Sequence, residues 1–158
     1  MNKEIASYKN RLDYLFKQVA VACNSDDEML AHWAKYLCVR CAGFIEVAIP
    51  KLFLEYSKLH TRNARVHRFM TTQLDSIQNV KAEKLITIVS YFDVSWGKEV
   101  EEFMGEEGRK EAINSIVAQR HLIAHGKDSS MSFVSLKDYY KKLIEVFDFI
   151  QSLLFPVE

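Results

Sequence analysis

Arg120 and His125 are the two side chains in this sequence whose types and spacing best suit chemistry. An arginine stabilises a crowded phosphate through paired hydrogen bonds. A histidine titrates near neutral pH, so it can take up a proton and give it back. Together they predict cleavage of RNA by its neighbouring 2′-hydroxyl. That reaction needs a base, an acid and charge stabilisation, but no metal or cofactor.

The place of Arg120 in its helical pattern is unusual. Apolar residues recur around it at helical spacing: Ile113, Ile116, Val117 and Ala124. This stripe predicts a core-facing position at 120, where a guanidinium is costly unless it is paired or faces a cleft. A buried structural ion pair with Glu46 is the alternative interpretation. His125, taken alone, would fit a histidine stabilised by the dipole of a helix C-terminus.

The chemistry also predicts an oligomeric state. One histidine does not easily serve as both acid and base in a single turnover. A two-fold dimer would supply a second Arg120 and a second His125 across one cleft, so we expect a homodimer. Gly126 follows His125 and is expected to end the helix in a left-handed conformation. His121, directly after Arg120, is expected to assist in the same site.

Arg40 and Glu46 lie on either side of Gly43 in an earlier helical segment. A glycine inside a helix costs roughly 1 kcal/mol relative to alanine and often marks close packing. Close helix packing is therefore the simpler interpretation of this segment. The functional interpretation is that Arg40 and Glu46 support the candidate active site.

Two pairs of residues raise the alternative of a zinc site. Cys38 and Cys41 lie three positions apart, and His121 and His125 lie four apart. Such a set of four side chains matches the ligands that zinc prefers. About eighty residues separate Cys41 from His121, however, and no finger-like turn surrounds either pair. We therefore expect no metal.

A basic run between Ser57 and Leu74 contains no acidic residue: Lys58, His60, Arg62, Arg65, His67 and Arg68. Its three arginines are candidates for contact with RNA phosphates. A solvated helix face is the alternative. The whole chain has 21 Lys and Arg against 21 Asp and Glu, so overall charge does not attract nucleic acid. RNA contact would have to come from a local patch.

Apolar residues at helical spacing predict an all-α fold, an antiparallel bundle of about five to seven helices. Pro50 predicts a kink in the longest helix, and Ser135 is expected to cap the last one. A short run of acidic residues from Glu99 to Glu107 is expected to be surface. The helices expected from the pattern are 3–22, 27–59, a shorter one that ends near residue 74, 82–92, 93–104, 109–125 and 136–154.

Composition limits the class of protein. Of 158 residues, 49% are hydrophobic, and few glycines or prolines mark a linker, so we expect a single domain over residues 1–158. The cysteines are odd in number, and the N-terminal sequence is charged and amphipathic. No apolar stretch approaches the length that a bilayer requires. These features predict a cytoplasmic protein with reduced thiols and no membrane partner.

The run Arg120-His121-Leu122-Ile123-Ala124-His125-Gly126 resembles the signature of HEPN domains, in which four residues separate an arginine from a histidine near the end of a late helix. Two further segments resemble the RiboL-PSP-HEPN group within that family. They are CVRCAGFIE at 38–46, and NVKAEK at 79–84 leading to FDVSW at 92–96. The likeness covers about residues 27–154.

The resemblance implies a helical fold that dimerises with its motif helices facing each other. Many proteins of this kind are RNases of toxin–antitoxin or phage-defence systems, so it also implies RNA as substrate and an antitoxin or another defence protein as partner. Some HEPN toxins carry a tyrosine that a nucleotidyltransferase modifies, two residues after the motif histidine. Lys127 stands there in this chain, so that form of control is not implied.

Two rival functions stay open at the level of sequence. The first is a catalytically silent HEPN module that binds a partner protein or a nucleotide. The second is a zinc-stabilised regulatory domain. Intact Arg120 and His125 favour an RNase over both.

Overall fold

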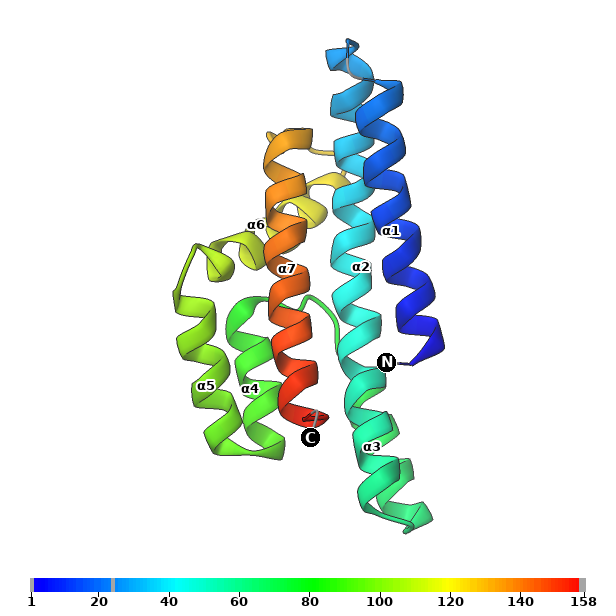
Figure 1. The fold of residues 1–158 in the computed structure, drawn as a ribbon, viewed down its shortest axis with the longest axis vertical. Coiled ribbons are helices and arrows are strands. Elements are labelled where there is room, and N and C mark those ends of the chain that lie inside the picture. Colours follow the sequence, from blue (N-terminus) through cyan, green and yellow to red (C-terminus); the bar gives the residue numbers. More distant parts are fainter. Residues whose placement is uncertain (1, 24, 157–158) are drawn as a thin grey trace.

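The chain forms a bundle of helices in a computed structural model that describes residues 2–23 and 25–156 (Figure 1). The predicted all-α class is confirmed, because the described residues form helices and connecting turns without a strand. The seven helices are α1 (Lys3–Ala22), α2 (Asp27–His60), α3 (Ala64–Asp75), α4 (Ala82–Phe92), α5 (Val94–Gly105), α6 (Arg109–Ala124) and α7 (Phe133–Leu154).

Helix α2 is the spine of the bundle, with 34 residues. The Asp26 side chain caps its start by accepting a hydrogen bond from the Met29 amide at 2.9 Å. Helices α1, α3, α6 and α7 all pack against α2, and α4 and α5 form a hairpin beside α6 and α7 (Figure 1). Helix α2 continues through the buried Pro50 without a break, so the kink there stays a prediction.

One hydrophobic cluster receives buried side chains from all seven helices. Fully buried Phe44 and Phe53 of α2 meet Phe147 of α7 and Phe92 of α4, with ring centroids 5.3 and 4.2 Å apart. Gly43 marks a close approach, because a Cβ there would lie 3.0 Å from the Tyr8 hydroxyl of α1. The packing interpretation of this glycine is therefore confirmed. None of the described helices is both long and apolar enough to cross a membrane.

The start of α7 differs from the prediction. Ser132, and not Ser135, is the N-cap, and its hydroxyl accepts a hydrogen bond from the Ser135 amide at 3.1 Å. The helix begins at Phe133. The side chain of Phe133 is buried against Phe16 of α1, so tertiary packing draws the first turn of the helix forward.

Candidate active site

The end of α6 presents the candidate histidine. His125 is the C-cap residue, and Gly126 adopts a left-handed conformation with φ of 67°. The Gly126 amide donates to the Ile123 carbonyl at 3.1 Å, and the Lys127 amide donates to the Leu122 carbonyl at 2.9 Å. This pair of bonds is a Schellman motif, which confirms the predicted stop. It leaves the His125 side chain exposed at the helix end.

Arg120 is held by two polar groups that come from outside its own helix. Its Nη1 donates to Oδ1 of Asn79 at 3.1 Å. Its Nη2 lies 3.8 Å from Oε2 of Glu46 on α2. The other oxygen of Glu46, Oε1, accepts from the Asn79 amide at 2.7 Å. Glu46, Asn79 and Arg120 therefore form a closed polar triangle, which we call the arginine clamp.

The core-facing position predicted for residue 120 is wrong. The Arg120 side chain keeps 31% of its surface exposed, and Ala124 is also exposed. The fully buried part of the stripe ends at Val117, and in the last two turns of α6 Ile123 packs against the core while only partly buried. The guanidinium is thus partnered on one side and open to solvent on the other, a suitable arrangement for binding an anion.

Asn79 is the site residue that the sequence pattern did not single out. Its φ of 51° is left-handed, a conformation that asparagine tolerates better than most residues. The segment it belongs to is tied to α6 a second time, because the Ala82 amide at the start of α4 donates to Oδ1 of Asn114 at 3.0 Å. The available signals were its place at the head of the NVKAEK segment and an asparagine shortly before a helix.

His121 and His125 lie together, as predicted. Their ring centroids are 4.4 Å apart in an edge-to-face arrangement. His121 also borders a pocket of about 500 Å³ between α6 and the segment that precedes α4. The other residues that line this pocket are Asn79, Lys81, Val117, Ala118 and Leu122. Lys81 and Asn79 thus bring a cation and an amide to the histidine side of the site.

Within one chain, Arg120 and His125 do not contact each other. Five residues on a helix correspond to roughly 7.5 Å along the axis and a rotation of about 140° around it. The Arg120 side chain accordingly bonds to Asn79 within the arginine clamp, whereas the His125 ring packs on His121. The two candidate groups point to different sides of α6.

Arg40 lies elsewhere. Its Nη1 donates to the Tyr36 hydroxyl at 3.1 Å, and its guanidinium stacks over the Tyr8 ring at 4.9 Å. These aromatic hydroxyls raise the pKa of Arg40 still further. The interactions of Arg40 in the described chain are with α1 and α2, and none reaches α6. Of the two predicted supporting residues on α2, only Glu46 therefore touches Arg120.

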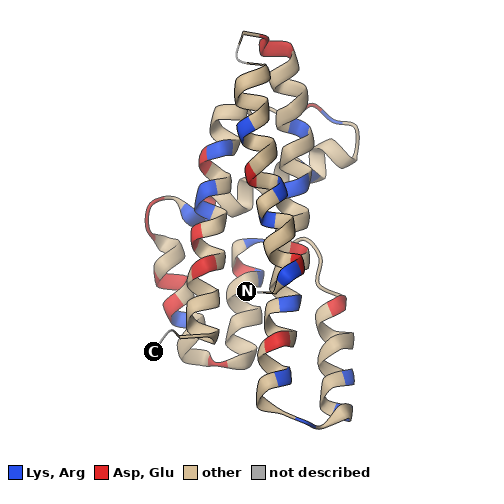
Figure 2. Ribbon diagram, turned by 45° about the vertical axis from the view of Figure 1, so that its right-hand side comes forward, with Lys and Arg blue, Asp and Glu red and all other residues tan. Residues whose placement is uncertain are grey.

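The basic run occupies the lower end of the molecule, around the turn between α2 and α3 (Figure 2). Arg62, Arg65 and Arg68 are exposed. In the described part of the chain none of the three has a carboxylate partner within 4.0 Å. Their guanidinium groups are accessible to phosphates, and the same exposure fits a solvated helix face.

The four proposed zinc ligands do not come together. Cys38 and Cys41 are buried in the core, and burial raises the pKa of the Cys38 thiol to about 12. His121 and His125 are exposed at the end of α6. Over residues 2–23 and 25–156, no cluster of three or more His, Cys, Asp or Glu side chains has the geometry of a metal site.

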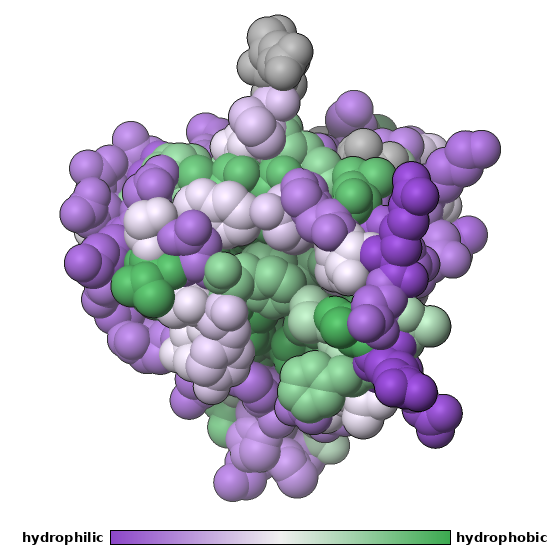
Figure 3. Space-filling view, turned by 90° about the horizontal axis from the view of Figure 1, so that it is seen from below, coloured by the Kyte–Doolittle hydropathy of each residue, from purple (hydrophilic) through white to green (hydrophobic). Residues whose placement is uncertain are grey.

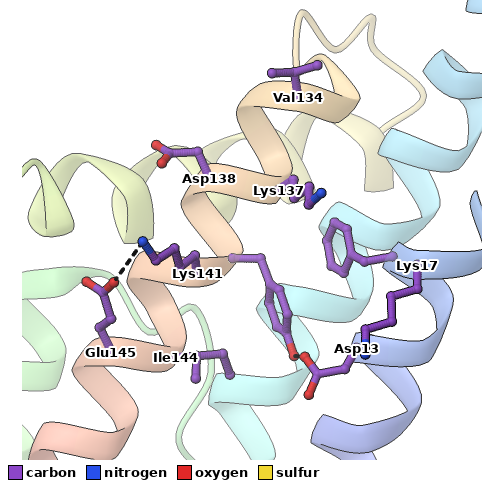
Figure 4. Close-up of a pocket in the computed structure, with 10 residues that line it drawn as sticks. Asp13, Lys17, Val134, Lys137, Asp138, Lys141, Ile144 and Glu145 are labelled. Atoms are coloured by element: carbon purple, nitrogen blue, oxygen red, sulfur yellow. Dashed lines mark hydrogen bonds and ion pairs between the residues drawn. The ribbon is translucent and has the colours of Figure 1, made fainter. Parts of the chain in front are cut away.

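A larger pocket of about 640 Å³ lies between α1 and the first half of α7 (Figure 4). Its lysines are interleaved with carboxylates, and the Lys141 Nζ lies 3.8 Å from Oε1 of Glu145. The Tyr140 hydroxyl donates to Asp13 at 2.8 Å, and burial with this hydrogen bond raises the pKa of Tyr140. No residue of the arginine clamp lines this pocket, and its charges cancel.

Comparison with known proteins identifies the family to which the chain belongs. A sequence model described as RiboL-PSP-HEPN matches residues 3–154. The chain belongs to this HEPN family. The match begins in α1, so it extends further toward the N-terminus than the likeness predicted for about residues 27–154. No curated protein and no solved structure matches the chain. The helical bundle agrees with the all-α fold of HEPN domains.

Proposed function

We propose that this HEPN protein is a metal-independent endoribonuclease that works as a homodimer, with Arg120 and His125 as its catalytic residues. The observation that carries the proposal is the state of Arg120. Its guanidinium is fixed by Asn79 and Glu46 yet 31% exposed, one residue from a histidine pair at an open helix end. HEPN domains include nucleases as well as binding modules.

The chemistry begins with the 2′-hydroxyl of the RNA. A His125 removes its proton, and the oxygen forms a bond to the adjacent phosphorus. The bond from phosphorus to the 5′-oxygen breaks, and a second His125 protonates the leaving oxygen. The products are a 2′,3′-cyclic phosphate and a 5′-hydroxyl. Two histidines, one from each protomer, supply the base and the acid.

Arg120 stabilises the charge that builds on the non-bridging phosphate oxygens. A guanidinium has five N–H donors, and the arginine clamp engages only its Nη1 and Nη2 ends. The remaining N–H groups are available to the phosphate. Glu46 and Asn79 are positioning residues in this scheme, because they hold the guanidinium without reaching the RNA themselves. His121, whose ring lies edge-to-face with that of His125, fixes the orientation of the His125 ring.

The biological setting that fits such an RNase is a toxin–antitoxin or phage-defence system, with an antitoxin or a related protein as a regulatory partner. The family supports this setting only by analogy.

A silent HEPN module is the second candidate, and one observation favours it. The Glu46 carboxylate faces Arg120, as the structural ion-pair interpretation anticipated. In a silent module this pair would only hold α6 against α2. Such a module would still dimerise and bind partners.

The products of cleavage separate the two candidates. Purified protein should cleave a mixed panel of RNAs in EDTA and leave 2′,3′-cyclic phosphates or the 3′-phosphates formed from them. RNA with 2′-O-methyl groups at the cut site should resist, because its nucleophile is blocked. Cleavage that EDTA abolishes, or that leaves 5′-phosphates, would contradict the mechanism. A folded dimer that leaves every RNA intact would favour the silent module.

A further inference from the structure

An apolar groove lies between α3 and α4, away from the catalytic pair. Its volume is about 630 Å³. Figure 3 shows this lower end of the molecule, where apolar side chains surround a hollow and hydrophilic side chains form its margin. The apolar residues that line the groove are Phe69, Met70, Leu74, Ile77, Ile88, Tyr91 and Phe92.

The groove exists because α3 has only one substantial packing partner. Helix α3 packs on α2 and makes no comparable contact with α4. Leu74 is its one buried residue. Its apolar stripe therefore faces α4 across open space, where a second helix would normally lie.

Two aromatic rings stand at the edges of this groove rather than in its floor. Phe69 of α3 is 64% exposed and Tyr91 of α4 is 81% exposed. Isolated exposed apolar residues need no explanation, but two rings on facing helices of one groove form a surface on which flat groups can stack.

The one charged side chain that lines the groove is basic, Lys84. Arg65 and Arg68 are exposed on α3, four and one residues before Phe69, and Asp75 is exposed at the end of the same helix. No carboxylate lines the groove. This differs from the pocket between α1 and α7, where acids balance the lysines.

The groove leads toward the candidate active site along one segment of chain. Ser76, Ile77 and Lys84 line the groove. Asn79 and Lys81, within the same segment, line the pocket beside His121. The groove and that pocket are thus both lined by the connection between α3 and α4 and the first turn of α4, and Asn79 of this segment also bonds to Arg120.

We infer that this groove binds the single-stranded part of the RNA substrate, an inference that rests on the proposed nuclease function. Bases stack on Phe69 and Tyr91, while Arg65, Arg68 and Lys84 contact the phosphates. Stacking requires bases whose faces are free, which a duplex does not offer. The groove thus selects RNA that is unpaired beside the cut.

Binding of an uncleavable RNA tests this directly. The probe is a fluorescent 2′-O-methyl oligoribonucleotide, and its anisotropy is measured with the full-length chain. The double variant F69A/Y91A should bind at least about tenfold more weakly, since stacking is worth roughly 1–3 kcal/mol per base and about 1.4 kcal/mol is tenfold. Tyr14→Ala, which removes an exposed ring of α1, is the matched control and should bind like the wild type.

The variant F69L/Y91L guards against misfolding, because it keeps an apolar side chain at both positions and removes only the rings. It should lose binding as F69A/Y91A does. A duplex of the same sequence should bind more weakly than the single strand. Its affinity should be the same for the wild type and for both variants. Arg65→Ala with Arg68→Ala should lower the slope of log affinity against log salt by about two. Wild-type affinity in F69L/Y91L would overturn the inference and favour an apolar protein segment as the occupant.

These outcomes are independent of cleavage. The anisotropy measurement uses an RNA that cannot be cleaved, so it reports binding in the groove whether or not the protein is a nuclease. If binding depends on the two rings but no RNA is cleaved, the groove inference stands and the nuclease proposal fails. If RNA is cleaved but binding does not depend on the rings, the nuclease proposal stands and the groove inference fails.

Discussion

Arg120, at the scale of single residues, is partnered but not buried. Its two contacts, with Asn79 at 3.1 Å and Glu46 at 3.8 Å, fix the guanidinium against the body of the protein. In a nuclease this fixation lowers the reorganisation needed when the phosphate becomes more negative. In a silent module the same contacts would contribute only to stability.

Substitutions of Arg120, His125 and Asn79 distinguish a catalytic role of the arginine from a purely structural one. Arg120→Ala and His125→Ala should each lower the rate of RNA cleavage by roughly a hundredfold or more, because each removes a direct participant. Asn79→Gly keeps the left-handed backbone and removes one partner of Arg120, so its loss should be smaller, roughly tenfold. Circular dichroism should show all three variants folded. Equal losses in all three would mean that Asn79 does more than position Arg120.

Helix α6 is oriented, at the scale of elements, by an arginine at its other end. Arg109 is buried, and its Nε and Nη2 lie 3.1 Å from Glu145 and 2.7 Å from Glu107. Its Nη1 donates to the Phe103 carbonyl at 3.1 Å. Helices α5, α6 and α7 are thereby joined at one point, far along the helix from His125.

Arg109→Met should lower the free energy of unfolding by roughly 2 kcal/mol, because it removes the hydrogen bonds from a buried guanidinium to the Phe103 carbonyl and to the partly exposed Glu145 carboxylate. Urea unfolding measures this change. Lys110→Met is the matched control, since Lys110 is paired with Glu83 at the surface, and it should change stability much less. Comparable losses in both variants would show that the hydrogen bonds of Arg109 contribute no more to stability than a surface ion pair does.

At the scale of the whole molecule, the separation of Arg120 and His125 on α6 predicts a site shared between two protomers. If both protomers complete one site, the protein should sediment at about twice the 18.4 kDa mass of the chain at micromolar concentration. The exposed end of α6, with His121, Ala124 and His125 accessible, is where we expect the two-fold axis.

Mixed dimers test the shared site. When wild-type chains are exchanged with an equal amount of His125→Ala chains, activity should fall to about a quarter rather than a half, because only dimers with two histidines retain acid and base. Cleavage assays at a series of mixing ratios measure the curve. A linear dependence, or a monomer in sedimentation, would contradict the composite site.

The sequence by itself determined the local structure of this protein. The helix ends at Asp26 and Gly126 were predictable because capping depends on a few neighbouring residues and on the left-handed preference of glycine. The all-α class followed from apolar periodicity, and the resemblance to HEPN domains rested in part on the order of residues at 120–126. Ser132 was missed because the competing cap, Ser135, is equally good locally, and only the burial of Phe133 decides between them.

The tertiary structure alone decided which side chains meet. Arg40 and Glu46 are six residues apart on α2, yet only Glu46 reaches Arg120, because the side of a helix that faces a neighbour depends on how the helices cross. Asn79 entered the site for the same reason, since it is 41 positions from Arg120 along the chain. The groove between α3 and α4 is also a product of packing. Its apolar residues have the periodicity of an ordinary core, and because no other described helix packs over them, Phe69 and Tyr91 stay exposed.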